Sequence, residues 1–184
     1  LHLRRKLGRR YLIGLSLLTL GLIETRAGTP ERARFHCEQA LEIFREMEDA
    51  RGIGIACNAL AECLRLITDT DLLTREQAIE YLNTASTYAE EAVKIFHEQV
   101  MEPLRLAETY IEDGCVYREL VRHLSVDDPQ RSAAVEKSRM AYEAATEVAE
   151  RNGYEYRAID ALVNMAWLYY YVGDVRTAED ILRI

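Results

Sequence analysis

The sequence predicts an all-α protein, built as a solenoid of antiparallel helix pairs, from its composition, its periodicity and an internal repeat. The 184 residues include three prolines and nine glycines, too few breakers for many short strands. Apolar residues make up 49% of the chain, which is enough for a core and excludes a disordered protein. Similar segments recur around Ala40, Ala92 and Ala145, which are 52 and 53 residues apart. A fixed period of this kind is typical of repeat architectures.

Each recurring segment is predicted to be the second helix of a pair. Apolar and small residues follow one another at alternating steps of three and four, which places them on one face of a helix. A small residue also stands seven positions before each of these alanines, at Ala33, Ala85 and Ser138. Small side chains let a neighbouring helix approach closely, so we expect Ala40, Ala92 and Ala145 to be buried at helix crossings.

The first helix of each pair carries its own small residue, at Gly21, Ala61, Gly114 and Ala166. The late alanine follows this residue by 19 positions in the first pair and by 31 positions in the second and third. We therefore expect the second and third hairpins to be taller, with the twelve extra residues shared equally between their two helices rather than held in a loop.

In chain order, the predicted helices span residues 6–27, 30–48, 52–68, 73–99, 103–124, 130–152, 155–172 and 174–184. Pro30, Pro103 and Pro129 lie at or just before helix starts, where a missing backbone N–H costs nothing. Gly28, Gly173 and Asn152–Gly153 are expected to end helices, because glycine readily adopts positive φ. The segments 68–71 and 125–129 supply the aspartate and serine residues typical of turns and N-caps.

The fourth unit resembles the tetratricopeptide repeat (TPR), with a small residue at Ala166, an aromatic at Tyr169, a turn glycine at Gly173 and alanine at Ala178. The first unit matches at Leu20, Gly21, Gly28, Ala33 and Ala40. The second and third units depart from the pattern through their longer hairpins, a missing turn glycine and Asp113 in place of the usual leucine. The resemblance implies a single right-handed α-solenoid of about four units over residues 1–184.

The resemblance also implies a function, because the first helices of such arrays line a concave face that binds a peptide or protein partner. The corresponding positions here are Asn58, Glu62, Arg65, Ile111, Arg118, Trp167 and Tyr170, with Leu18, Leu22, Cys115 and Val163 beside them. Arg65 and Arg118 are placed to form a two-pronged carboxylate clamp, or else are solvated or paired with Glu62 and Glu119. Trp167 and Tyr170 are either partner-binding residues or part of the core.

Segments such as 48–62 resemble the linker and first helix of repeats in bacterial signal-transduction ATPases and in transcription activators of the maltose-activator type. This likeness implies a sensor or interaction scaffold within a larger cytoplasmic regulatory protein. Two alternatives remain, a structural spacer between domains and an all-helical enzyme or ligand-binding domain. A neighbouring ATPase or DNA-binding module would favour the scaffold over the spacer.

Several classes of chemistry lack the residues they require. The sequence has no paired Glu-x-x-His motifs for di-iron, no His-Glu-x-x-His zinc motif, no Cys-x-x-Cys pair and no glycine-rich phosphate loop. We therefore expect no catalytic residues, no metal and no cofactor. The four cysteines lie within helical patterns, as in a reduced cytoplasmic protein. The net charge of −8 disfavours nucleic-acid binding, although Arg4, Arg5, Lys6, Arg9 and Arg10 cluster at the start.

The two ends of the chain carry apolar residues. Basic residues followed by the apolar stretch 11–23 have the layout of a signal peptide, but the stretch is too short to span a membrane and belongs to the repeat. We expect the chain to be a piece of a longer protein, since it lacks an initiator methionine and stops inside an apolar pattern. Terminal repeats need polar caps, so we also expect this piece to self-associate through one or both ends, with Val175, Ala178, Ile181, Leu182 and Ile184 at one end and Leu12, Ile13 and Leu17 at the other. In the full-length protein, further repeats are expected to cover these surfaces.

Overall fold

A computed structural model of the chain describes residues 2–69 and 72–183, with side chains described from Gly8 onward. This part of the chain is 86% helical and contains no strand, which confirms the all-α prediction. Its elements are α1 (His2–Arg26), α2 (Pro30–Glu46), α3 (Ala50–Ile67), α4 (Arg75–Ile95), a π-helical turn (Phe96–Val100), α5 (Pro103–His123), α6 (Pro129–Arg151), α7 (Glu155–Val172) and α8 (Val175–Leu182). The side chains of Arg4, Arg5 and Lys6, and all of Ile184, lie outside the described part.

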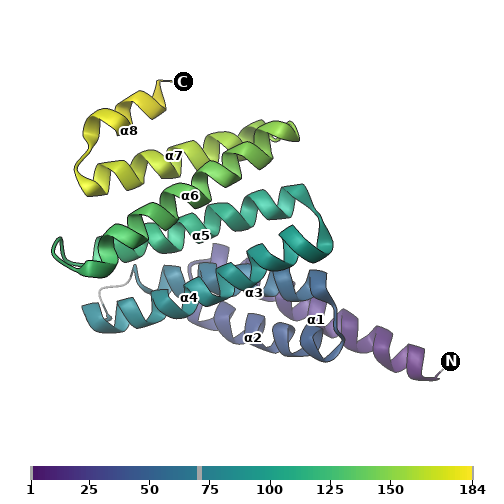
Figure 1. The fold of residues 1–184 in the computed structure, drawn as a ribbon. Helices are drawn as coiled ribbons and strands as arrows, with labels where there is room; N and C mark the ends of the chain where they lie inside the picture. The colour runs from purple at the N-terminus through teal and green to yellow at the C-terminus, as the bar shows by residue number, and fades with distance from the viewer. Residues whose placement is uncertain (1, 70–71, 184) are drawn as a thin grey trace.

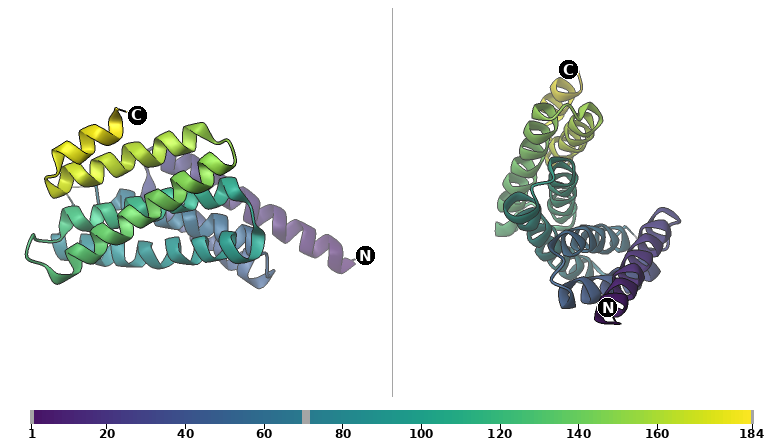
Figure 2. Two further views of the ribbon diagram at one scale, coloured as in Figure 1. Left: turned by 45° about the horizontal axis from the view of Figure 1, so that its top comes forward. Right: turned by 90° about the vertical axis from the view of Figure 1, so that its right-hand side faces the viewer.

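The helices pack in neighbouring pairs that follow one another along a single row (Figure 1, Figure 2). Each helix contacts the next helix in the chain. The first helices of the pairs, α1, α3, α5 and α7, are called the odd helices below, and each also contacts the following odd helix. Contacts between each pair and its neighbours therefore build the stack, as expected for a repeat architecture.

The predicted helix boundaries are confirmed to within a few residues. Pro30, Pro103 and Pro129 are the first residues of α2, α5 and α6. Gly28 (φ 75°) and Gly173 (φ 88°) adopt the positive φ expected of turn glycines. The predicted capping aspartate before α6 is Asp128, which accepts a hydrogen bond from the Gln130 backbone N–H at 2.8 Å. The helices consequently begin and end at the prolines, glycines and capping residue that the sequence supplies there.

The connection into α4 and the end of α4 differ from the prediction. The predicted turn at 68–71 is only partly covered, since residues 70 and 71 lie outside the described part. Helix α4 begins instead after a capping box, in which Thr74 and Gln77 exchange hydrogen bonds through their side chains and backbone. The π-helical turn follows α4 directly and is ended by Met101, which has φ 53°. The predicted single helix over 73–99 therefore begins later and changes its winding before it ends.

Small residues mark the helix crossings, as predicted. Ala40, Ala92 and Ala145 are fully buried. Gly21 lets α1 and α2 of the first hairpin approach closely, and Gly114 does the same for α5 and α6 of the third. A Cβ atom at Gly21 would lie 2.4 Å from Cys37 Sγ, and one at Gly114 would lie 2.5 Å from the Tyr142 ring. A larger residue at either position would therefore require the Cys37 or Tyr142 side chain to move.

The second and third hairpins are taller than the first, as expected, but the extra residues are not equally shared. Helix α2 begins ten residues before Ala40, whereas α4 and α6 begin 17 and 16 residues before Ala92 and Ala145. The odd helices extend less, because α1, α3 and α5 end five, six and nine residues after Gly21, Ala61 and Gly114. Compared with the first hairpin, α4 gains seven residues and α3 gains one, whereas α6 gains six and α5 gains four, and the connections take the remaining four and two. Sharing is therefore clearly unequal in the second hairpin and nearer to equal in the third.

Candidate functional site

The predicted partner-binding residues lie on the successive odd helices α3, α5 and α7, and two of them, Arg65 and Arg118, contact the next odd helix. Arg65 of α3 contacts Glu112 of α5 through two hydrogen bonds, Nε to Oε1 at 2.6 Å and Nη2 to Oε2 at 3.0 Å. Both side chains are largely buried. This bidentate pairing is the strong form of a charge-assisted hydrogen bond. Arg65 thus links two units of the stack.

Arg118 makes the corresponding link one unit later. Its Nη1 donates to Oδ1 of Asn164 on α7 at 2.5 Å, and its Nη2 donates to Glu119 Oε1 at 3.0 Å. Arg65 and Arg118 each stand four residues after the small residue of their helix, and Glu112 and Asn164 each stand two residues before theirs. Both arginines of the predicted clamp are therefore engaged by the protein's own side chains, with Glu119 as one anticipated partner of Arg118.

Three further predicted residues lie on the same two helices, α3 and α5. Ile111 is buried, and Asn58 and Glu62 are half-buried. Burial raises the pKa of Glu62, and neighbouring Glu112 adds to this shift, while Arg65 opposes it. The Asn58 Oδ1 atom has no hydrogen-bond partner among the described residues. Two of the seven predicted residues, Arg65 and Arg118, thus bind side chains of the next odd helix, and the role of all seven in binding a partner stays a prediction.

Asp113 of α5 is a largely buried acidic side chain near Glu90 and Lys137. Its Oδ1 atom is buried without a hydrogen-bond partner among the described residues. Burial raises its pKa to about 7, with a smaller contribution from Glu90 that Lys137 opposes. The sequence already marks Asp113 as unusual, because an apolar residue is expected there.

Stability is expected to fall as the pH rises from 5 to 8, and the Asp113→Asn substitution is expected to remove much of this fall. The unfolded chain ionises Asp113 near its ordinary value of 3.8, whereas the folded protein keeps the proton to about pH 7. The folded state is therefore favoured at low pH and loses about 2–4 kcal/mol as the pH rises from 5 to about 7, with no further loss above the folded pKa. Urea denaturation at pH 5 and pH 8 measures this loss. Asp127→Asn, in an exposed turn, is the control, and equal pH dependence in both variants would contradict the assignment.

Trp167 and Tyr170 differ from the other predicted residues because they are open to solvent. Trp167 is 49% exposed and Tyr170 is 55% exposed. They pack edge to face with ring centroids 5.7 Å apart, and Tyr171 lies about 6 Å from both. Arg122 lies over the Tyr171 ring at 5.4 Å, which anchors the cluster to α5. The rings are held in place while two of them face outward.

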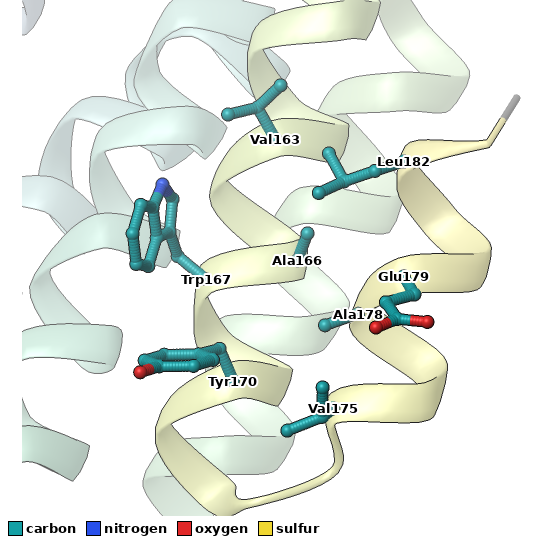
Figure 3. Close-up of a pocket in the computed structure, with 8 residues that line it drawn as sticks. All are labelled: Val163, Ala166, Trp167, Tyr170, Val175, Ala178, Glu179 and Leu182. Carbon is teal, nitrogen blue, oxygen red and sulfur yellow. The ribbon is translucent and has the colours of Figure 1, made fainter.

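A groove runs between α7 and α8 beside these rings, and Figure 3 shows Trp167 and Tyr170 projecting side by side from α7. The groove has a volume of about 410 Å³, and its only charged lining residue is Glu179. The other lining residues are Val163, Ala166, Trp167, Tyr170, Val175, Ala178 and Leu182. A second hollow of about 660 Å³ shares Val163 and Leu182 with it and extends toward Glu150 and Glu155. The first of these hollows is called the α7–α8 groove below. Its apolar lining suits an apolar partner helix better than a polar small molecule.

The described residues offer little other chemistry. The four cysteines are buried and unbridged, and burial raises the pKa of Cys57 and of Cys115. No group of three His, Cys, Asp or Glu side chains in the described ranges is arranged to hold a metal ion. Among the helices of this part of the chain, none has the length and apolar character needed to cross a membrane.

Comparison with known proteins gives no match to a family model and no significant match to a curated protein. The function of the chain is therefore inferred from its own side chains. Two site features were missed from the sequence, the inter-helix acceptors Glu112 and Asn164 and the contribution of Leu182 to the groove. The repeat did carry a signal for the acceptors, since both stand at the same position relative to a small residue.

Proposed function

We propose that this chain is a non-catalytic interaction scaffold of the tetratricopeptide type, right-handed in its winding, which binds a helix of a protein partner in the α7–α8 groove. The observation that supports this proposal is a difference in solvent exposure between equivalent positions of α7 and α5. Val163, Trp167 and Tyr170 stand three before, one after and four after Ala166. At the same positions in the third unit, Ile111 is buried, and Cys115 and Arg118 contact Asn164 of α7. Only the α7 set faces solvent in the described part of the chain.

The chemistry of the groove supports a helical protein partner. Exposed tryptophan and tyrosine side chains carry much of the binding energy at protein interfaces, because they bury large apolar areas with few rotatable bonds. Elsewhere in this stack, each odd helix after α1 contacts both helices of the pair before it, so a helix is the element that these pairs receive. A place within a larger regulatory protein follows from the resemblance to bacterial regulators. A bare spacer has no use for two clustered aromatic rings on its surface.

Photo-crosslinking in the cells that produce the protein tests this proposal. With Tyr170→p-benzoylphenylalanine, we expect one dominant crosslinked protein whose crosslink maps to a helix. Tyr156, on the same helix, is 89% exposed and lies outside the groove, so the same replacement there is the matched control. The purified partner helix should quench or shift the fluorescence of Trp167, the only tryptophan. Truncation by Trp167→Ala should weaken its binding at least about tenfold.

Two results would favour the spacer instead. One is an identical crosslinking pattern at positions 170 and 156, which would show that the groove selects nothing. The other is a partner whose affinity is unchanged by Trp167→Ala, which would show that it binds elsewhere.

A further inference from the structure

We propose that the helix received by the α7–α8 groove is α1 of a second copy of this chain, docked head to tail. This inference rests on the proposed function and names the partner of the same site. It starts from the outer face of α1, defined by Leu12, Ile13, Ser16, Leu20 and Ile23, all of which are exposed. Four of these five are large apolar residues, and they lie on one helix of the described structure without a covering element.

The repeat register shows what the outer face of α1 is built to contact. Ile23 stands two residues after Gly21 and is 59% exposed. The same position on the later odd helices is Cys63, Val116 and Leu168, and each of these is fully buried. Cys63 contacts Thr25 of α1 at 3.3 Å, so this position faces the preceding odd helix. The outer face of α1 is therefore the surface by which an odd helix rests on the pair before it.

The groove is the complementary half of the same interface. Leu182 of α8 is 60% exposed, whereas the equivalent residues of α2, α4 and α6 are fully buried. Those residues are Cys37, Ala89 and Tyr142, each four positions after the small residue of its helix, as Leu182 is after Ala178. Cys37 and Tyr142 lie against Gly21 and Gly114 of their own hairpins, whereas Leu182, Trp167 and Tyr170 are left open and offer a docked helix an apolar surface. Within the described structure, the α7–α8 groove is therefore open, and the outer face of α1 has the register of a helix that fits there.

The same register places specific side chains opposite one another in the docked pair. Arg65 contacts Glu112, and Arg118 contacts Asn164. In each case the arginine stands four residues after the small residue of its own helix, and its partner stands two residues before the small residue of the next odd helix. Continuing this rule places Thr19 of the second copy opposite Tyr170. The Thr19 hydroxyl donates to the Leu15 carbonyl, so its oxygen accepts a hydrogen bond from the Tyr170 hydroxyl.

Charge also favours this partner. The first ten residues include five basic and no acidic side chains, and Arg9 and Arg10 are exposed on α1. Successive odd helices run in the same direction (Figure 1), so the start of a docked α1 lies beside the start of α7. Glu150 and Glu155 line the hollow at that end of the groove. Opposite charges at the two ends steer this orientation rather than its reverse.

A pair of surface variants tests the head-to-tail geometry. Trp167→Glu blocks the groove and leaves α1 intact, and Ile23→Glu blocks α1 and leaves the groove intact. Because the contact joins two different surfaces, the wild-type chain should grow past a dimer as its concentration rises. Each variant alone should sediment as a monomer, and an equimolar mixture should form a dimer and nothing larger. Phe35→Glu, at an exposed apolar site on α2 outside both surfaces, should behave as the wild type.

Circular dichroism of all four proteins should show the same helix content, which separates a lost contact from a lost fold. A wild-type chain that stays monomeric at every concentration would overturn the inference. So would a mixture that stays monomeric, or self-association of Ile23→Glu alone, which would indicate a groove-to-groove contact. If the wild type is monomeric but position 170 still crosslinks to another protein, this inference fails and the proposed function stands.

Discussion

Replacing Arg65 with methionine is expected to destabilise the protein by about 3–5 kcal/mol, because it leaves Glu112 as a buried carboxylate without its partner. The pair joins α3 to α5 by two hydrogen bonds, and both side chains are at least 85% shielded from solvent. Methionine keeps most of the volume of the arginine stem, so the loss is electrostatic rather than a cavity. Urea denaturation at pH 7 measures the change in unfolding free energy.

Two further variants separate burial from pairing. Arg65→Met combined with Glu112→Leu removes both charges and should recover most of the lost stability, since apolar replacement of a buried pair is often neutral. Arg45 of α2 also forms two hydrogen bonds to a carboxylate, from its Nη2 to both oxygens of Glu91 on α4, but that pair is exposed. Arg45→Met should therefore cost only about 0–1 kcal/mol. Equal costs for Arg45→Met and Arg65→Met would contradict the view that burial makes the α3–α5 link important.

The positions of the helices could be predicted from the sequence because local residues determine them. Prolines begin α2, α5 and α6, and Gly28 and Gly173 end α1 and α7 by adopting positive φ. The spacing of small residues likewise located the crossings at Ala40, Ala92 and Ala145. The π-helical turn at Phe96–Val100 had no such signal, since its five residues suit an ordinary helix as well.

The environment of the site residues could not be predicted in the same way. Alignment of the repeat correctly placed Arg65, Arg118 and Tyr170 at one position, but it did not say which neighbour covers that position. The answer depends on a residue about 47 positions away, such as Glu112 for Arg65. Position within the repeat is a local property, whereas exposure depends on whether another helix follows. Trp167 and Tyr170 therefore stand out only once the stack is assembled.

The substitution Tyr142→Ala is expected to destabilise the protein by about 3–5 kcal/mol, the usual loss for a large aromatic side chain in a core. Tyr142 is fully buried, and its ring lies against Gly114 at the crossing of α5 and α6. Gly114→Ala should also destabilise, by about 1–3 kcal/mol, because the new methyl group would meet the ring. Thermal or urea unfolding monitored by circular dichroism measures both losses.

The double variant decides whether this contact explains the glycine. Without the Tyr142 ring the methyl group has room, so Gly114→Ala should become stabilising by up to about 1 kcal/mol, the gain of alanine over glycine within a helix. Gly8→Ala is the matched control, since Gly8 also lies within a helix but has open space where its Cβ would be. It should stabilise slightly in both backgrounds. A Gly114→Ala effect of the same sign with and without Tyr142 would show that the glycine serves the backbone of α5 rather than the close approach of α6. The reversal of sign requires that α5 and α6 touch at this point, and so tests the packing on which the repeat register and the α7–α8 groove both depend.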